Sequence, residues 1–199
     1  MSDGRKPRAA TEEKRRRILD ATEEIMLKDG YAAVSSRSVA TAVGIQAPLV
    51  HYYFTTLDDL FVAVLQRRAG RNVERMAAAL LSAEPLRAWW ELASDPRGTA
   101  MFVELLAAAN HRPALKAEVG AVAREVRRMQ LEVLDRVLPE YGIDPELFTP
   151  PLVAAAMQGL AFSAVQDDVA GYDTAAGEAI TAMGNLIQQL EARRAEGLS

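Results

Sequence analysis

Apolar residues recur every three to four positions along almost the whole chain, and this period constrains the fold more than any other feature. One example is the stripe Ile18, Ala21, Ile25 and Met26, whose spacing places all four side chains on one face of a helix. No segment alternates apolar and polar residues as a half-buried strand does. The sequence therefore predicts an all-α protein.

The first predicted helix runs from about Thr11 to Asp29. Thr11 is a suitable N-cap, and Gly30 supplies the residue that most often follows a helix C-terminus. The segment before it, residues 1–12, is basic and polar, so we expect it to be a disordered arm in the absence of a partner.

Two short helices follow, separated by a glycine. Ser35 or Ser36 can cap the first of them, and Gly44 ends it after two turns. The second begins near Gln46 and is complete at Phe54. Two short helices joined by a tight turn predict a helix-turn-helix.

The motif residues keep a fixed order and spacing from the first helix into a long fourth one. They are Arg17, Ile18, Leu19, Gly30, Tyr31, Val39, Ala40, Val43, Gly44, Ile45, His51, Tyr52, Tyr53, Phe54, Asp58, Asp59 and Leu60. In this pattern the chain resembles the DNA-binding domain of the TetR family of transcription regulators. The resemblance implies a helix-turn-helix domain at 13–56, a ligand-binding and dimerisation domain at 57–195, and a short tail at 196–199.

The resemblance also implies which side chains face DNA, the partner of such a domain. Toward the major groove it places Arg37, Ala47, Pro48, Leu49, His51 and Tyr52, and at phosphates Ser36 and Tyr53. An arginine can donate two hydrogen bonds to guanine, which makes Arg37 the strongest candidate for direct readout. The alternatives are a solvated surface role for Arg37 and a packing role for the two tyrosines.

Two positions depart from the family pattern. His51 stands where a tyrosine is common, and Leu57 stands where the family usually has a phosphate-binding lysine. The loss of that lysine removes one cationic contact. We expect the basic arm to compensate for it.

The charge distribution agrees with a DNA-facing N-terminal part. The net charge is −4, yet residues 1–70 hold 11 Lys and Arg against 9 Asp and Glu, and the remainder holds 12 against 18. Positive charge clusters at Arg5, Lys6, Arg8 and again at 14–17, which is the candidate phosphate-facing surface. The alternative is an ordinary solvated face.

The composition excludes several other functions. The chain has no cysteine and only two histidines, so disulfides, thiolate chemistry and a histidine-rich metal site are excluded, and we expect no cofactor. No apolar run reaches the length of a membrane span, and no hydrophobic stretch follows the N-terminal basic residues. We therefore expect a cytoplasmic protein.

The last two predicted helices are rich in alanine and glycine, and we interpret them as the interface of a homodimer with two-fold symmetry. The stripe assigned to that interface consists of Val153, Met157, Leu160, Ala164, Ile180, Met183, Ile187 and Leu190. The alternative is that both stripes are buried within the monomer.

The resemblance to the TetR family also implies a pocket for a small effector among the middle helices, and the apolar residues there indicate a largely hydrophobic molecule. The candidate lining residues are Trp89, Met101, Phe102, Leu105, Met129, Phe162 and Val165, each with core packing as the alternative. The predicted protein is thus a dimeric repressor that binds a pseudo-palindromic operator and is released by an effector.

Two other functions are alternatives to this one. A helical enzyme lacks support, because no nucleophile triad, phosphate-binding glycine loop or Glu-x-x-His site is present. An interaction module that has lost DNA binding is suggested only by the acidic net charge and by Leu57.

Overall fold

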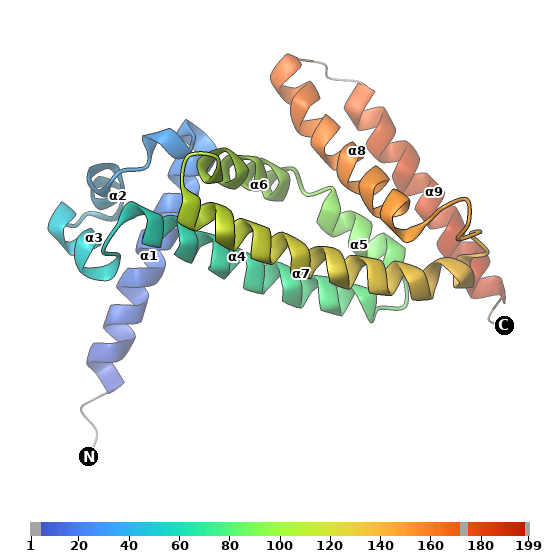
Figure 1. Cartoon of the computed structure of the whole chain (residues 1–199), viewed down its shortest axis with the longest axis horizontal. Helices are drawn as coiled ribbons and strands as arrows, with labels where there is room; N and C mark the ends of the chain where they lie inside the picture. The colour runs from blue at the N-terminus through green and yellow to red at the C-terminus, as the bar shows by residue number, and fades with distance from the viewer. Residues whose placement is uncertain (1–4, 172–174, 198–199) are drawn as a thin grey trace. The chain divides into compact units, whose positions relative to one another are not determined.

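The structure, a computed structural model, describes residues 5–171 and 175–197. Within these ranges the chain forms nine α-helices and two short 3-10 helices, with no strand, which confirms the predicted all-α fold (Figure 1). The α-helices are α1 (Arg5–Asp29), α2 (Ser36–Val43), α3 (Ala47–Tyr53), α4 (Leu57–Leu80), α5 (Pro85–Ala93), α6 (Pro96–Ala109), α7 (Pro113–Val137), α8 (Pro150–Ala170) and α9 (Ala175–Gly197). The 3-10 helices are η1 (Tyr31–Ala33) and η2 (Leu138–Tyr141). None of the helices in the described ranges combines the length and the apolar character needed to cross a membrane.

Helix α1 begins earlier than its sequence predicts. It starts at Arg5, so residues 5–12 of the expected disordered arm are helical, and residues 1–4 lie outside the described residues. Pro7 falls in the first turn, where a backbone N–H has no intrahelical acceptor. Further along, Arg16 donates to Glu13 at 2.6 Å and to Asp20 at 3.0 Å, the spacings at which helical ion pairs form.

The chain divides into two compact units. The first contains Met1–Ala69 and Met101–Gly120, and the second contains Gly70–Ala100 and Ala121–Ser199. Helices α4, α6 and α7 each contribute residues to both units. This division is drawn from the contacts of the structure and differs from the linear boundary at residue 56 that the sequence predicts.

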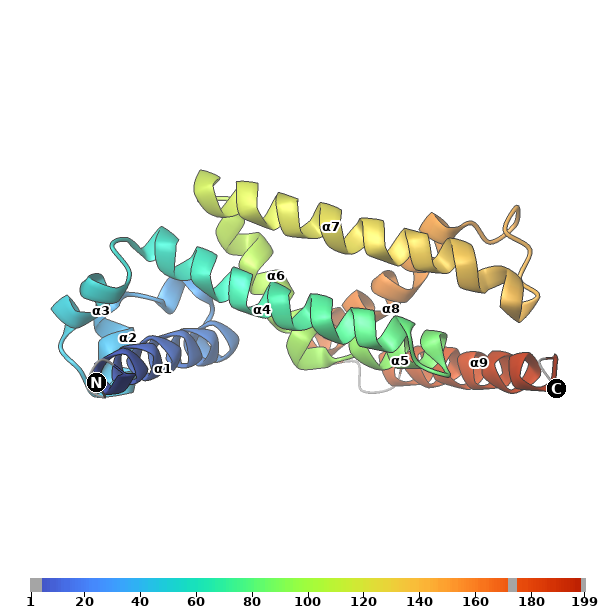
Figure 2. The ribbon, with the colours of Figure 1, turned by 90° about the horizontal axis from the view of Figure 1, so that it is seen from below.

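In the first unit, α1 packs against α2 and η1, and α2 packs against α3. Both views show these helices as one group at the N-terminal part of the chain (Figures 1 and 2). The core of this unit consists of buried side chains from every helix that contributes to it: Ile18, Leu19, Met26, Val39, Val43, Val50, Phe54, Leu60, Phe61, Val64, Met101, Leu105 and Leu115.

An ion-pair cluster joins α4 to α1 beside this core. Arg67 donates to Asp20 at 2.7 Å and also to Glu23, and Arg68 donates to Glu23 at 3.1 Å. Glu23 is buried, and a buried carboxylate needs such partners. The cluster therefore fixes the orientation of α1 relative to the first turns of α4.

Two further contacts attach α6 and the start of α7 to the same unit. Glu104 of α6 accepts a hydrogen bond from the backbone N–H of Tyr31 at 2.6 Å, and Arg112 donates to Asp58 at the start of α4. The Arg112 guanidinium also lies over the ring of Phe61, 4.7 Å from its centroid. These contacts explain why residues 101–120 belong to the first unit.

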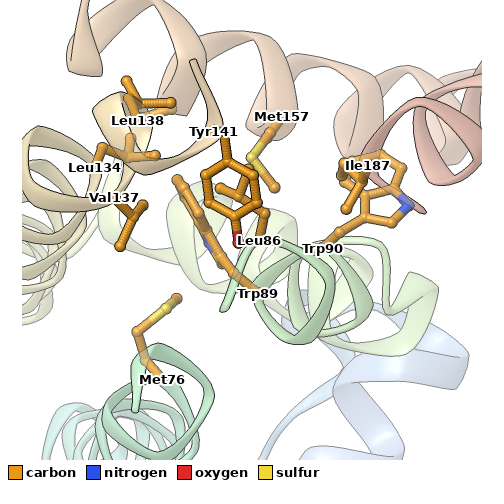
Figure 3. Close-up of a cluster of buried hydrophobic side chains, with 11 residues drawn as sticks. Met76, Leu86, Trp89, Trp90, Leu134, Val137, Leu138, Tyr141, Met157 and Ile187 are labelled. Carbon is orange, nitrogen blue, oxygen red and sulfur yellow. The ribbon is translucent and has the colours of Figure 1, made fainter. Parts of the chain in front are cut away.

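The second unit is built around a tryptophan-centred core. Trp89, Leu86 and Tyr141 lie side by side with Met157 next to them, and Trp90 lies against Ile187 (Figure 3). Helices α8 and α9 pack against each other and lie side by side in Figure 1. The remaining buried members of the cluster are Met76, Leu134, Val137, Leu138 and Ala154.

A buried carboxylate at the edge of this core ties three elements together. Glu191 of α9 accepts from the Tyr141 hydroxyl at 2.7 Å and from the Arg87 backbone N–H at 3.1 Å. Burial and, second, the bond to Glu191 raise the pKa of Tyr141, so the phenol stays a donor. Arg194 covers the pair, with its guanidinium 5.3 Å from the Tyr141 ring centroid.

Candidate nucleic-acid interface

The turn between α2 and α3 is defined at both of its ends by local chemistry. Ser35 caps α2: its side chain accepts from the Ser38 N–H at 3.0 Å, and the Ser38 hydroxyl accepts from the Ser35 N–H at 2.9 Å. Gly44 ends the helix in the left-handed conformation, with φ of 72°, and donates to the carbonyls of Ala40 and Thr41. Ser35, and not Ser36, is therefore the cap.

Helix α3 starts after an extended Gln46 and carries Pro48 in its first turn, where proline removes no needed donor. Val50 and the C-cap residue Phe54 are buried and hold α3 on the core of the first unit. One side of α3 is therefore part of the hydrophobic core.

The opposite face of α3 is open to solvent. The Tyr52 side chain is 77% exposed, Pro48 and His51 are exposed, and Ala47 and Leu49 are half-buried. A helix whose first residues face outward can enter a major groove, whereas one packed inside the unit cannot. The structure thus brings the candidate groove-facing residues together on one surface.

Arg37 lies in the first turn of α2 and is exposed. Arg37 and Asp29 both line an open cleft of about 500 Å³. Within the described ranges, however, Arg37 makes no ion pair with Asp29 or with any other carboxylate. Its guanidinium keeps all of its donors for a ligand, as base readout requires.

Ser36 and His51 are linked to each other. The Ser36 Oγ and His51 Nε2 atoms are 2.9 Å apart, and His51 Nδ1 lies 3.4 Å from the Thr55 carbonyl oxygen. This bond between α2 and α3 was not predicted from sequence, because it joins residues 15 positions apart through a side-chain rotamer. This hydrogen bond couples the two candidate DNA-contacting side chains to each other.

Tyr52 and Tyr53 differ in their surroundings. Their rings meet edge to face with centroids 5.2 Å apart, but Tyr53 is half-buried while Tyr52 projects into solvent. Tyr52 is thus free for contact with a partner. Tyr53 combines a packed ring with a hydroxyl that suits the phosphate role assigned to it.

The basic run at residues 14–17 is engaged largely within the protein. Arg17 donates to the Val43 carbonyl at 2.8 Å at the end of α2, and Arg15 lies over the Phe54 ring at 5.1 Å. Arg16 pairs with Glu13, and this hydrogen bond lowers the pKa of the Glu13 carboxyl. Lys14, Arg15, Arg16 and Arg17 all remain exposed, so the run stays a candidate phosphate-facing surface, while Arg15 and Arg17 also contact the ends of α3 and α2. The side chains of Arg5, Lys6 and Arg8 lie outside the described residues.

The candidate effector residues are divided between the two units. Met101, Phe102 and Leu105 belong to the first, whereas Trp89, Met129, Phe162 and Val165 belong to the second. Trp89, Met101 and Leu105 are buried, and the other four are half-buried. Trp89 and Met129 come together in the core of the second unit. For these two residues the structure thus favours core packing, the alternative to a role in lining a pocket.

The candidate dimer stripe is also partly internal. Met157 and Ile187 are almost fully buried in the core of the second unit, so their assignment to an exposed interface is corrected. Val153, Leu160, Ile180, Met183 and Leu190 are half-buried against that core, and Ala164 is half-buried. The exposed positions beside the stripe are Leu152, Ala155, Ala156 and Gly159 on α8 and Ala182 and Leu186 on α9.

Part of this chain resembles known proteins. Residues 18–64 match the family described as bacterial regulatory proteins, tetR family. The transcriptional repressor KstR of Mycolicibacterium smegmatis is 41% identical over 69 residues, which are 35% of this chain and 32% of that protein. The transcriptional activator FasR of the same organism is 30% identical over 73 residues, which are 37% of this chain and 33% of that protein. The chain matches about a third of the length of these curated relatives.

Beyond that part the similarity is one of fold. A crystal structure of a transcriptional regulator from Saccharomonospora viridis in complex with choline superimposes with a TM-score of 0.72, covering 89% of this chain and 96% of that chain at 18% identity. The helical arrangement of the chain is therefore shared beyond the matched N-terminal segment.

Proposed function

Through its helix-turn-helix domain this chain belongs to the TetR family of bacterial regulatory proteins, and from that premise we propose that it represses transcription by binding a specific DNA sequence. The observation that carries the proposal is the outward face of α3, where Tyr52 is 77% exposed and His51 and Pro48 are accessible. A regulator of this kind acts by binding and not by catalysis. Since it works on chromosomal DNA, we place it in the cytoplasm.

We assign the contacts by chemistry. Arg37 donates to guanine O6 and N7, and Pro48 and Leu49 offer apolar contact to thymine methyls. Ser36 lies in the first turn of α2, whose backbone N–H groups lack intrahelical acceptors and favour a phosphate. The complete proposed DNA-binding set is Ser36, Arg37, Ala47, Pro48, Leu49, His51, Tyr52 and Tyr53.

Selection of bound fragments from genomic DNA, followed by a salt titration of the selected duplex, tests the proposal. A protein that neutralises several phosphates loses affinity steeply as salt rises, and the selected fragments share a pseudo-palindromic sequence. Failure to enrich any sequence, with no salt-dependent affinity for duplex DNA, would favour the interaction module instead.

We further propose that the chain acts as a homodimer through α8 and α9. A two-fold DNA reader needs a self-complementary face, and the exposed small and apolar residues on these two helices suit close packing in a four-helix bundle. Leu152 and Leu186 are each 50% exposed, an unfavourable state for large apolar side chains that a partner subunit would relieve. The half-buried members of the predicted stripe complete the interface.

The domain at 57–195 is the proposed effector-binding part. The transcriptional regulator from Saccharomonospora viridis, which shares this fold, was crystallised in complex with choline. This complex is consistent with a small-molecule site in a helical domain of this type. Because Trp89 is a core residue here, we centre the site within the second unit on the half-buried Phe162 and Val165, for a largely hydrophobic effector that releases the protein from DNA. Loss of operator binding on addition of candidate apolar compounds tests this step.

A further inference from the structure

The hydrogen bond between Ser36 and His51 ties the start of α2 to the end of α3 on the exposed face. Both ring nitrogens of His51 are engaged, Nε2 with Ser36 Oγ at 2.9 Å and Nδ1 with the Thr55 carbonyl at the longer distance of 3.4 Å. His51 is exposed and Ser36 is half-buried. The ring is thus held in one orientation at a place where solvent and a ligand reach it.

The donors and acceptors of this chain of groups follow from their chemistry. The Thr55 carbonyl can only accept, so Nδ1 carries a proton and donates to it. In the neutral ring Nε2 then has a lone pair, and the Ser36 hydroxyl must donate its only proton to it. In this state Ser36 has no hydrogen left for another acceptor.

Protonation reverses the direction of the Ser36 bond. In the imidazolium both nitrogens donate, so Nε2–H points to Ser36 Oγ and the hydroxyl proton is released to face outward. A DNA phosphate oxygen only accepts hydrogen bonds. A neutral ring can free the Ser36 hydroxyl proton only by moving its own proton to Nε2 and giving up the bond to Thr55, so the cationic histidine alone keeps both of its bonds while Ser36 donates to a phosphate.

We propose that DNA binding takes up a proton at His51, which converts Ser36 into a phosphate donor, so that affinity for DNA rises as the pH falls. The proposal rests on the proposed function, specifically on a phosphate at Ser36. The binding surface is thereby sensitive to pH through two residues that act as one site.

The surroundings of His51 favour this coupling. On α2 the charged residue next to Ser36 in sequence is Arg37. At the start of α4 the carboxylate of Asp59 accepts a hydrogen bond from the Thr56 N–H at 2.9 Å. On α3 itself the neighbouring titratable group is Tyr52. Within the described residues no carboxylate lies within ion-pair distance of the His51 ring, so the phosphate is the anion that stabilises its charge.

The experiment measures binding of a fluorescein-labelled mixed-sequence duplex of about 24 base pairs by anisotropy, at constant ionic strength, from about pH 5.5 to 8.0. A phosphate contact does not depend on sequence, so a generic duplex reports it. For the wild type we expect affinity to fall about fivefold or more as the pH rises across this range. This is the effect of losing one hydrogen bond in each helix-turn-helix domain.

Three variants isolate the mechanism. In His51→Gln the side-chain amide is a permanent donor near the Nε2 position, so the affinity that remains becomes largely independent of pH. In Ser36→Ala binding is weak throughout and the part of the pH dependence that acts through serine is lost. His111→Gln removes the other of the two histidines, which is exposed at the turn after α6, and retains the wild-type profile.

The outcomes distinguish a failure of the proton coupling from a failure of the proposed DNA-binding function. If Ser36→Ala or His51→Gln keeps the full wild-type pH profile, while circular dichroism shows an intact fold, the proton coupling is overturned and the DNA-binding function stands. A wild-type protein that fails to bind the duplex at any pH and salt overturns the proposed function itself.

Discussion

Helix α3 and the α8–α9 pair both carry apolar stripes at helical spacing, but the two regions use them differently. In α3 the turn at Gly44 defines which side faces outward, and Val50 and Phe54 are buried while Tyr52 is exposed. In α8 and α9 the stripe that the sequence singles out is partly internal: Met157 and Ile187 are buried, whereas Leu152 and Leu186, which lie outside the stripe, are half exposed. A motif with a turn specifies an exposed face, whereas periodicity alone specifies only a helix.

The adjacent residues Ile187 and Leu186 offer the largest test of this difference. Ile187 is 4% exposed and Leu186 is 50% exposed. We expect Ile187→Ala to lower the free energy of unfolding by about 3 kcal/mol through cavity formation, and Leu186→Ala by less than about 0.5 kcal/mol. Urea unfolding followed by circular dichroism measures both values. Equal losses would contradict the assignment of Ile187 to the core.

A charge at Leu186 tests the outer face of the same pair. Leu186→Asp should leave the single chain folded but separate the dimer, and DNA affinity should fall roughly hundredfold because two linked heads no longer bind together. Sedimentation equilibrium and anisotropy check the two effects. Gln188→Asp, a change at another exposed position of α9, serves as the control. A variant that stays dimeric would place the interface on another surface.

Arg37→Ala sharpens the comparison on the side of α2 and α3. Loss of a bidentate contact to guanine should cost about 2 kcal/mol on the selected operator and relax the preference at one base pair. Competition binding with operators mutated at each position measures it, and Arg193→Ala on the exposed side of α9 is the matched control. Uniform weakening on all sequences would reassign Arg37 to a phosphate.

The smallest expected effect concerns the cap of α2. Ser35→Ala removes the acceptor for the Ser38 N–H and should lower the free energy of unfolding by about 1 kcal/mol, whereas Thr41→Ala, at an exposed position of the same helix, should change it little. Thermal unfolding compares the two variants. A larger loss for Thr41→Ala would contradict the capping assignment.

Much of the fold followed from the sequence because local rules determine it. The end of α2 at Gly44 and the start of α3 near Gln46 were predicted from capping and turn residues, and both agree with the structure. The sequence predicts the start of α1 near Thr11, whereas the helix begins at Arg5, because Pro7 fits a first helical turn and Ala9 and Ala10 favour a helix despite the polar composition of residues 1–12. Composition alone therefore specifies this boundary poorly.

The site was predictable only in part. The exposed positions of α3 were identified by order and spacing, but the internal use of Arg15 and Arg17 depends on tertiary contacts with Phe54 and Val43. The bond between Ser36 and His51 depends on rotamers across two helices. The burial of Ile187 depends on which neighbour covers α9, and α5 does so through Trp90.

The hydrogen bond from the Tyr31 amide to Glu104 has a practical consequence for dissecting the protein. A gene fragment cut at residue 56 would leave that amide without its acceptor and would remove Asp58 together with its Arg112 partner. The excised head should therefore fray at the end of α1, and its Tyr31 amide should exchange with deuterium much faster than in the intact chain. The smallest part of the chain that we expect to fold alone is therefore discontinuous in sequence, because residues 101–120 complete the N-terminal unit.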